Sequence, residues 1–420
     1  MTHVKDKTGI AAARWAPPQR PRWVRLLNQV GSNLGEASAL VALDEASLLA
    51  TAQHLTGLDD FGDDAWREPF GLLLADVENE AKLNLTGRLL TRYDLLRSLM
   101  FRLRMTEAEK RHPEILDEQI TEPIFITGLG RTGTSILHES MAQDPRLRAP
   151  LGWELRYPGL EPGDDDKRVA MTAAEVDLWL EVIPEFAPIH EISIDGPDED
   201  SVGLQHEFAS QVWGGTNRVP NFDMWMATKG WTQAFAFERR LLRHLQFGKP
   251  GRWILKGIYA ACLPNLFAEF PDARVVMTHR DPLKVLASMA NMLSTLRWQR
   301  SDAVDYDEIV APLGFGIPFL LDMVVEQRKT GVVPNDRFVD VGFADLMADH
   351  MGTLGRVYEE LDMDLTDEAA TSIGAYLDAK PRGRHGAHAY SVDTLGLDPI
   401  DMRTKFANYM SHFNVPEEHQ

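Results

Sequence analysis

The sequence has little cysteine: Cys262 is the single one among 420 residues. One cysteine excludes an internal disulfide, and a chain without disulfides suits a reducing compartment. We therefore expect the protein to be cytoplasmic.

Long hydrophobic runs are also missing. Residues 1–31 are basic and contain no continuous apolar segment, so no secretory signal is predicted there. No apolar run reaches the length of a membrane-spanning helix, and we expect no integral membrane segment. The hydrophobic content of 44% and the charged content of 25% are typical of an ordinary soluble globular protein.

Positive charge is scarce relative to negative charge. The chain has 43 Lys and Arg residues against 63 Asp and Glu residues, a formal net charge of −20. An acidic surface repels nucleic acids and anionic membranes, so neither is expected as a partner. Association of the chain with copies of itself is left open.

The most informative segment is residues 123–138, Pro-Ile-Phe-Ile-Thr-Gly-Leu-Gly-Arg-Thr-Gly-Thr-Ser-Ile-Leu-His. Its apolar start predicts a buried strand, which breaks into a turn at Gly128, Gly130 and Gly133 and leads into a helix. Glycines let backbone amides face one point, and a helix N-terminus adds partial positive charge. This order therefore predicts a phosphate-binding loop.

The loop has the spacing of a P-loop but lacks its lysine. Ser135 stands where the P-loop Ser or Thr would be, whereas Thr134 occupies the lysine position, and the nearest cation is Arg131. Without the lysine, and without an obvious aspartate for magnesium, ATP or GTP hydrolysis loses its main machinery. The loop predicts a phosphate site that needs no metal.

A second motif lies in residues 273–289, Ala-Arg-Val-Val-Met-Thr-His-Arg-Asp-Pro-Leu-Lys-Val-Leu-Ala-Ser-Met. A β-branched strand is expected to end at Arg280. Asp281 and Pro282 then begin a helix, and Ser288 follows eight residues after the arginine.

Together the two motifs resemble those of sulfotransferases that use 3′-phosphoadenosine 5′-phosphosulfate (PAPS), over roughly residues 121–415. With arginine at position 131, the loop resembles that of the tyrosylprotein sulfotransferases and of many bacterial sulfotransferases, which carry arginine at the same position. The resemblance implies PAPS as co-substrate, no metal, and a 3′-phosphate held by Arg280 and Ser288. The implied contacts of the 5′-phosphosulfate are Gly130, Arg131, Thr132, Gly133, Thr134 and Ser135.

The resemblance also implies catalytic roles. Arg131 and Lys256, which follows an expected strand, would neutralise charge on the departing phosphate. In the arginine-loop members a glutamate shortly after the first helix acts as the base. Glu154 matches that position here, and the neighbouring Trp153 would shield it from water. His190 and His206 are the alternative bases.

Two further regions have a distinctive composition. Sulfotransferases commonly close a basic, glycine-containing loop near the C-terminus over the nucleotide, so the resemblance implies Arg382, Arg384 and His385 of the basic segment 381–391 as candidate contacts. A solvated basic turn has the same composition. Residues 152–250 are rich in Trp and Phe and are the expected place for an apolar acceptor pocket. The same rings could instead form the core of a helical subdomain.

The expected fold is α/β, with a P-loop-like parallel sheet flanked by helices on both faces. Residues 1–30 are expected to be a mobile arm or one that wraps a neighbour, 31–120 a helical extension, and 121–420 the PAPS-binding domain with its insertion at about 152–250. Strands are predicted near 123–127, 252–256, 274–278 and 337–341. Helices are predicted near 133–143, 259–269, 282–297, 343–361, 366–379 and 400–413.

The predicted function is transfer of a sulfuryl group to the hydroxyl of a small-molecule or lipid-like acceptor. Two other functions stay open at this point. An ATP-dependent small-molecule kinase could use the same sheet but would need magnesium, and a non-catalytic nucleotide-binding protein would bind the nucleotide without transfer.

Overall fold

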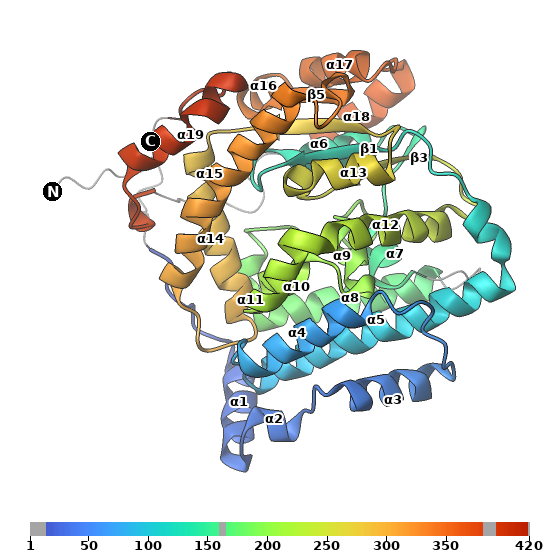
Figure 1. Ribbon diagram of the computed structural model, residues 1–420, viewed down its shortest axis with the longest axis vertical. Helices are drawn as coiled ribbons and strands as arrows, with labels where there is room; N and C mark the ends of the chain where they lie inside the picture. The colour runs from blue at the N-terminus through green and yellow to red at the C-terminus, as the bar shows by residue number, and fades with distance from the viewer. Residues whose placement is uncertain (1–13, 159–164, 381–391, 419–420) are drawn as a thin grey trace.

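The computed structural model describes residues 14–158, 165–380 and 392–418, and a parallel sheet lies in its upper part (Figure 1). The strands are β1 (Ile124–Gly128), β2 (Leu147–Arg148), β3 (Arg252–Lys256), β4 (Arg274–His279) and β5 (Phe338–Gly342). Their order is β2-β3-β1-β4-β5, and each neighbouring pair is parallel. The predicted parallel sheet is confirmed, and the short strand β2 adds an edge that was not expected.

Helices cover both faces of this sheet because successive side chains of a strand point to opposite sides. Ile124 of β1 packs in a cluster with α6 (Thr134–Met141). Phe125, the next residue, packs on the other face with α12 (Trp231–Gln246) and α13 (Leu263–Glu269). Burial on both sides explains why β1 is continuously apolar.

The second half of the core is mostly helical, as predicted. Its helices are α14 (Pro282–Trp298), α15 (Tyr306–Thr330), α16 (Phe343–Ala348), α17 (His350–Glu360), α18 (Asp367–Ala379) and α19 (Pro399–His412). The helix expected over 343–361 is in fact two, because Asp349 lies between them and caps α17 by accepting from the amide of Gly352. Helix α15 was not predicted, since Pro312 and Pro318 are unusual in a helix interior.

Helix α15 also corrects the expectation that no apolar segment is long enough to span a membrane. It has 25 residues and a mean hydropathy of 1.7 in its most apolar stretch, which by length and composition alone could cross a membrane. Of that stretch 44% is buried, and the helix packs against α14 and α19. A core helix of a soluble protein gives the same signal. The absence of an integral membrane segment therefore stays a prediction.

The N-terminal extension is helical, as expected. Its helices are α1 (Arg22–Leu34), α2 (Ala37–Leu40), α3 (Glu45–Thr56), α4 (Arg67–Asn79) and α5 (Leu85–Arg111). Figure 1 shows them at the end of the molecule opposite the sheet. Helix α5 is tied to the rest of the chain by buried ion pairs, such as Asp94 with Arg300 at 2.6 Å. The boundary at residue 120 stays a prediction.

Residues 14–30 contact the rest of the chain, and residues 1–13 lie outside the described part of the chain. The expectation that residues 1–30 form a mobile arm, or one that wraps a neighbour, stays a prediction. Helix α1 begins at Arg22. Before it, the Trp15 indole donates to Thr295 Oγ1 at 3.1 Å, and the Arg20 guanidinium lies 3.9 Å from the Trp298 ring centroid. These contacts fix the segment against α14, because an aromatic face attracts a cation and an indole N–H needs an acceptor.

The insertion consists of helices of 4 to 18 residues between the extension and the sheet. They include α7 (Gly152–Arg156), α8 (Asp165–Val182), α9 (Ser201–Leu204), α10 (Gln211–Thr216), α11 (Pro220–Trp225) and α12, with single turns at Pro184–Phe186, Gln205–Glu207 and Met226–Gly230. Most of its aromatic rings are packed in the core: Phe208, Trp213, Phe222 and Phe235 are fully buried. These four rings therefore form part of the protein core and do not line an acceptor pocket.

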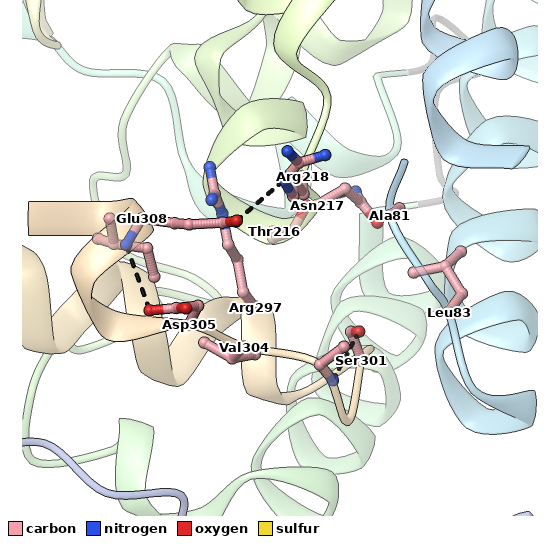
Figure 2. Close-up of a pocket in the computed structure, with 12 residues that line it drawn as sticks. Ala81, Leu83, Thr216, Asn217, Arg218, Arg297, Ser301, Val304, Asp305 and Glu308 are labelled. Carbon is pink, nitrogen blue, oxygen red and sulfur yellow. Dashed lines mark hydrogen bonds and ion pairs between the residues drawn. The ribbon is translucent and has the colours of Figure 1, made fainter. Parts of the chain in front are cut away.

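A small cavity lies where the extension, the insertion and the α14–α15 connection meet (Figure 2). Its volume is about 20 Å³, room for roughly one water molecule. Arg218 pairs with Glu308 across it at 3.3 Å. The cavity shares no lining residue with the predicted nucleotide site, and it is too small for an acceptor.

Candidate active site

The loop between β1 and α6 has the backbone of a phosphate cradle. Gly128 and Gly133 have φ angles of 155° and 92°, and a Cβ on Gly128 would lie 2.4 Å from Thr278 Oγ1. Glycine is therefore required at position 128. Arg131 has a φ of 69°, which is uncommon for a non-glycine residue and is found at ligand-binding turns.

Thr132 fixes this loop from below. Its side chain is buried, and its hydroxyl donates to the Leu129 carbonyl at 2.6 Å and lies 2.6 Å from Thr278 Oγ1. Thr278 is on β4, the strand that leads to the second motif. The two motifs therefore share a hydroxyl pair beneath the loop, while Thr134 and Ser135 begin α6 and are partly exposed.

Lys256 ends β3 next to the loop, since β1 and β3 pair through Ile126 and Lys256. Its ammonium group is buried and donates to Ser135 Oγ at 3.1 Å. It also forms an ion pair with Glu199 at 2.9 Å. Burial alone would lower the pKa of Lys256, but the Glu199 carboxylate outweighs burial and raises it. Lys256 is thus a stable cation at the predicted phosphosulfate loop.

Glu199 is the functional candidate that the sequence analysis missed. Desolvation on its own would raise the pKa of Glu199, but the neighbouring Lys256 and His190 lower it to about 2. The side chain is 29% exposed, and its second oxygen accepts from Ser201 Oγ at 3.4 Å. The only sequence signal was an acidic triplet, 198–200, inside an aromatic-rich insertion.

Arg131 and His190 complete this side of the site. The Arg131 guanidinium donates to the Ile189 carbonyl at 2.8 Å. Burial lowers the pKa of His190, the Glu199 carboxylate opposes that effect, and the positive charges of Lys256 and Arg131 add to it. His190 therefore lies within electrostatic range of both predicted cations and of Glu199.

The second motif meets the first at the same edge of the sheet. Arg280 follows β4 and donates through Nη1 to the carbonyl of Arg131 at 2.8 Å. Its guanidinium lies 4.0 Å from the centroid of the Phe343 ring and forms a bidentate pair with Glu418. Ser288 lies on α14, is 4% exposed, and its hydroxyl has no hydrogen-bond partner among the described residues. An unpartnered buried hydroxyl fits a hydrogen bond to a ligand group.

Glu154 has contacts that fix its own loop. The carboxylate accepts from the amide of Leu151 at 3.1 Å and from Arg148 at 3.0 Å, and Arg148 in turn lies over the Trp253 ring. Both oxygens are thus engaged at the start of α7. The role of Glu154 as base stays a prediction.

The other predicted residues are divided between the core and the undescribed part of the chain. His206 is fully buried, its Nε2 lies 2.8 Å from the Leu155 carbonyl, and burial lowers its pKa to about 3. These are features of a structural histidine. Arg382, Arg384 and His385 lie outside the described residues.

A lysine-free phosphate loop after β1, a buried lysine at the end of β3 and an arginine after β4 define a P-loop-like group-transfer fold. A family model described as the sulfotransferase family matches residues 123–367, more than half of the sequence. The protein belongs to the sulfotransferase family, as the two motifs indicated, and the expectation of a sulfotransferase-family enzyme is confirmed.

Solved structures of two mycobacterial sulfotransferases have the same fold. STF9 from Mycobacterium avium is 25% identical with a TM-score of 0.81, covering 90% of this chain and 98% of that one. STF1 from Mycobacterium tuberculosis H37Rv is 29% identical with a TM-score of 0.72, covering 87% of this chain and 98% of that one.

The curated relatives are named omega-hydroxy-beta-dihydromenaquinone-9 sulfotransferase Stf3, from Mycobacterium bovis and Mycobacterium tuberculosis. The one from M. bovis is 25% identical over 265 residues, which make up 57% of this chain. The alignment spans 63% of the relative's own length.

Proposed function

We propose that this protein transfers the sulfuryl group of PAPS to the hydroxyl of a lipid-like or other small-molecule acceptor. The observation that carries the proposal is the contact of the two motifs, in which Arg280 donates to the backbone of Arg131 at 2.8 Å. A nucleotide that carries both a 5′-phosphosulfate and a 3′-phosphate is suited to contact both motifs at once. The amides of the 130–135 loop would hold the 5′-phosphosulfate, and Arg280 with the unpartnered Ser288 hydroxyl would hold the 3′-phosphate.

The reaction is an in-line displacement at sulfur. The acceptor oxygen forms a bond to the sulfur, the bond from sulfur to the phosphate oxygen breaks, and that oxygen leaves with the electron pair as part of 3′-phosphoadenosine 5′-phosphate (PAP). Arg131 and Lys256 would stabilise the growing negative charge on the leaving phosphate. The proton of the acceptor hydroxyl passes to a carboxylate of the protein.

Two carboxylates are candidates for that proton. Glu154 has the position that the family resemblance implies, but both of its oxygens are engaged in its own loop. Glu199 is favoured by its contact with Lys256 at 2.9 Å. When Lys256 turns to the leaving oxygen of PAPS, Glu199 loses its partner, its pKa rises from about 2, and it becomes a better base. Binding of the donor would thus activate the base.

The acceptor class is supported by the relatives. The curated relatives are named for a hydroxylated menaquinone, a lipid with a terminal hydroxyl. The chain matches them over only part of their length, so the acceptor of this protein is proposed at the level of class. A lipid-like alcohol is the first acceptor to test.

The experiment is transfer of radioactive sulfate from labelled PAPS to a lipid extract, in buffer with a metal chelator. The proposal expects a labelled lipid product with the wild-type protein and about 10²–10³-fold slower labelling with a Lys256→Met variant. Transfer of labelled phosphate from ATP, present with magnesium and absent in chelator, would identify a kinase instead. Binding of PAP without label transfer to any acceptor would identify a non-catalytic protein.

A further inference from the structure

The predicted 3′-phosphate site contains a carboxylate of the protein itself. Glu418 accepts from Arg280 Nε at 2.7 Å and from Arg280 Nη2 at 2.9 Å. Both oxygens are used, so the pair has the two-point geometry that arginine forms with carboxylates and phosphates alike. The remaining Arg280 nitrogen, Nη1, donates to the phosphate loop at the Arg131 carbonyl. Three of the five guanidinium N–H donors are therefore engaged before any nucleotide arrives, two of them by Glu418.

The backbone of this segment is held independently of the carboxylate. The Glu418 amide donates to Asp281 Oδ2 at 2.9 Å. Asp281 also pairs with both terminal nitrogens of Arg403, each at 2.7 Å. A few residues earlier, Val415 is buried, and Phe413 stacks on His279 with a centroid distance of 4.1 Å. The segment is thus anchored at α14 and α19, and the Glu418 side chain can leave Arg280 by rotating about its own bonds.

The exposure of the pair suits exchange with a ligand. The side chains of Arg280 and Glu418 are 24% and 31% exposed. A carboxylate at this depth is held by a modest interaction, because solvent screens a partly exposed pair. A phosphate carries more negative charge and one more acceptor oxygen than a carboxylate, so it can replace Glu418 on the same guanidinium.

We propose that Glu418 is an intramolecular substitute for the 3′-phosphate, which occupies Arg280 between turnovers, is displaced by PAPS and returns as PAP leaves. The inference rests on the proposed function, because it needs the 3′-phosphate to bind at Arg280. Glu418 then weakens the binding of both PAPS and PAP, because it competes with their 3′-phosphate for Arg280. It also keeps Arg280 and the Arg131 loop in place while the site holds no nucleotide.

The adjacent Glu417 provides a matched control. It carries the same charge one residue away, but its carboxylate pairs with Arg403 Nε at 3.7 Å instead of with Arg280. Changing either glutamate to glutamine removes one negative charge from the same segment. A general charge effect on nucleotide binding would therefore appear in both variants, whereas competition for Arg280 would appear in one.

The test is calorimetric titration of the full chain and its variants with PAP and with AMP, which lacks the 3′-phosphate. We expect Glu418→Gln to bind PAP about threefold to tenfold more tightly than wild type and AMP equally. Glu417→Gln should leave both affinities unchanged. Wild-type PAP affinity in Glu418→Gln, or an equal gain for PAP and AMP, would overturn the proposal.

An Arg280→Ala variant separates this inference from the proposed function. If Arg280 holds the 3′-phosphate, this variant loses most of its preference for PAP over AMP, whatever Glu418 does. If Arg280→Ala keeps the preference, the 3′-phosphate assignment is wrong, and the role of Glu418 is overturned with it. If Arg280→Ala loses the preference while Glu418→Gln behaves as wild type, the role of Glu418 alone is wrong.

Discussion

Arg280 donates a hydrogen bond to the carbonyl oxygen of Arg131 at 2.8 Å, across 149 positions of sequence. The contact arises because β1 and β4 are adjacent parallel strands, paired from Ile124–Arg274 to Gly128–Thr278, and both motifs begin where these strands end. Ligands of such sheets bind beyond the carboxyl ends of the strands. Each of the predictions below tests a residue at this edge or directly behind it.

The first prediction concerns the two ends of the nucleotide. PAP should raise the melting temperature of the protein more than adenosine 5′-phosphosulfate at equal concentration, because only PAP can engage Arg280 and Ser288. The shift should grow with ligand excess over Kd. Ser288→Ala should reduce the shift from PAP without altering the melting temperature of the free protein. Equal shifts from both nucleotides would show that no 3′-phosphate site exists.

The second prediction concerns Lys256. The Lys256→Met variant keeps the aliphatic stem but removes the charge next to Ser135. We expect the single-turnover rate of sulfuryl transfer to fall by about 10²–10³-fold, the usual effect of losing one electrostatic stabiliser. Lys284→Met, on α14, removes the same charge outside the β3 position and serves as the control. A wild-type rate in Lys256→Met would make Lys256 a purely structural cation.

The third prediction separates the two candidate bases. Glu199→Gln cannot accept the hydroxyl proton, so turnover should fall by about 10²–10⁴-fold and the acidic limb of the pH–rate profile should disappear. Its PAP affinity should not weaken, because the change also frees Lys256. Glu154→Gln should keep most of its activity and lose a little thermal stability, because its ion pair with Arg148 is weakened.

The opposite pattern would return the role of base to Glu154. In that case Glu154→Gln would lose turnover and the acidic limb, and Glu199→Gln would retain both. Loss of turnover in His190→Ala, with both glutamine variants active, would assign the base to that histidine.

The fourth prediction concerns a buried acid pair behind the site. All four carboxylate oxygens of Asp200 and Glu238 lack a hydrogen-bond donor within the described ranges, and the Asp200 amide lies 3.4 Å from the Lys256 carbonyl. Burial and then the Glu238 charge raise the pKa of Asp200, whereas burial raises the pKa of Glu238 to about 7. Glu199, Lys256 and Cys262 are the other titratable groups that interact with the pair.

A pKa that is higher in the folded state means that the folded state binds the proton more tightly. The stabilisation is therefore full below the ordinary Glu pKa of 4.5 and is lost as the pH rises toward about 7. We expect Glu238→Gln to flatten this part of the stability profile by about 1–3 kcal/mol, measured by urea unfolding at several pH values. Glu359→Gln, at an exposed position, is the control. Parallel profiles for wild type and Glu238→Gln would contradict the raised pKa of Glu238.

The sequence was informative where a local pattern determines the structure. Gly128 and Gly133 signalled the loop because their backbone angles are disfavoured for other residues, and Asp281 signalled the start of α14 because it caps the helix by accepting from Leu283. Glu199 was not predicted, because its partner Lys256 lies in a distant strand and nothing in the acidic triplet distinguishes its middle residue. Glu418 was missed for the same reason, since only the fold brings it to Arg280.

The aromatic insertion shows the limit of composition. Its rings indicated either an acceptor pocket or a core, and fully buried rings such as Trp213 and Phe222 belong to the core. Composition cannot separate the two because both require the same apolar surface to leave water. Helix α15 was not predicted for another reason. Its two prolines argue locally against a helix, and tertiary packing overrides that local preference.

The central claim is that one PAP molecule spans both motifs, and a crystal structure of the complex with PAP tests it most directly. The account predicts the 5′-phosphate on the amides of the 130–135 loop and the 3′-phosphate within hydrogen-bonding distance of Arg280 and Ser288 Oγ, with the Glu418 carboxylate displaced. A nucleotide bound with its 3′-phosphate away from Arg280, or bound outside the 130–135 loop, would contradict it.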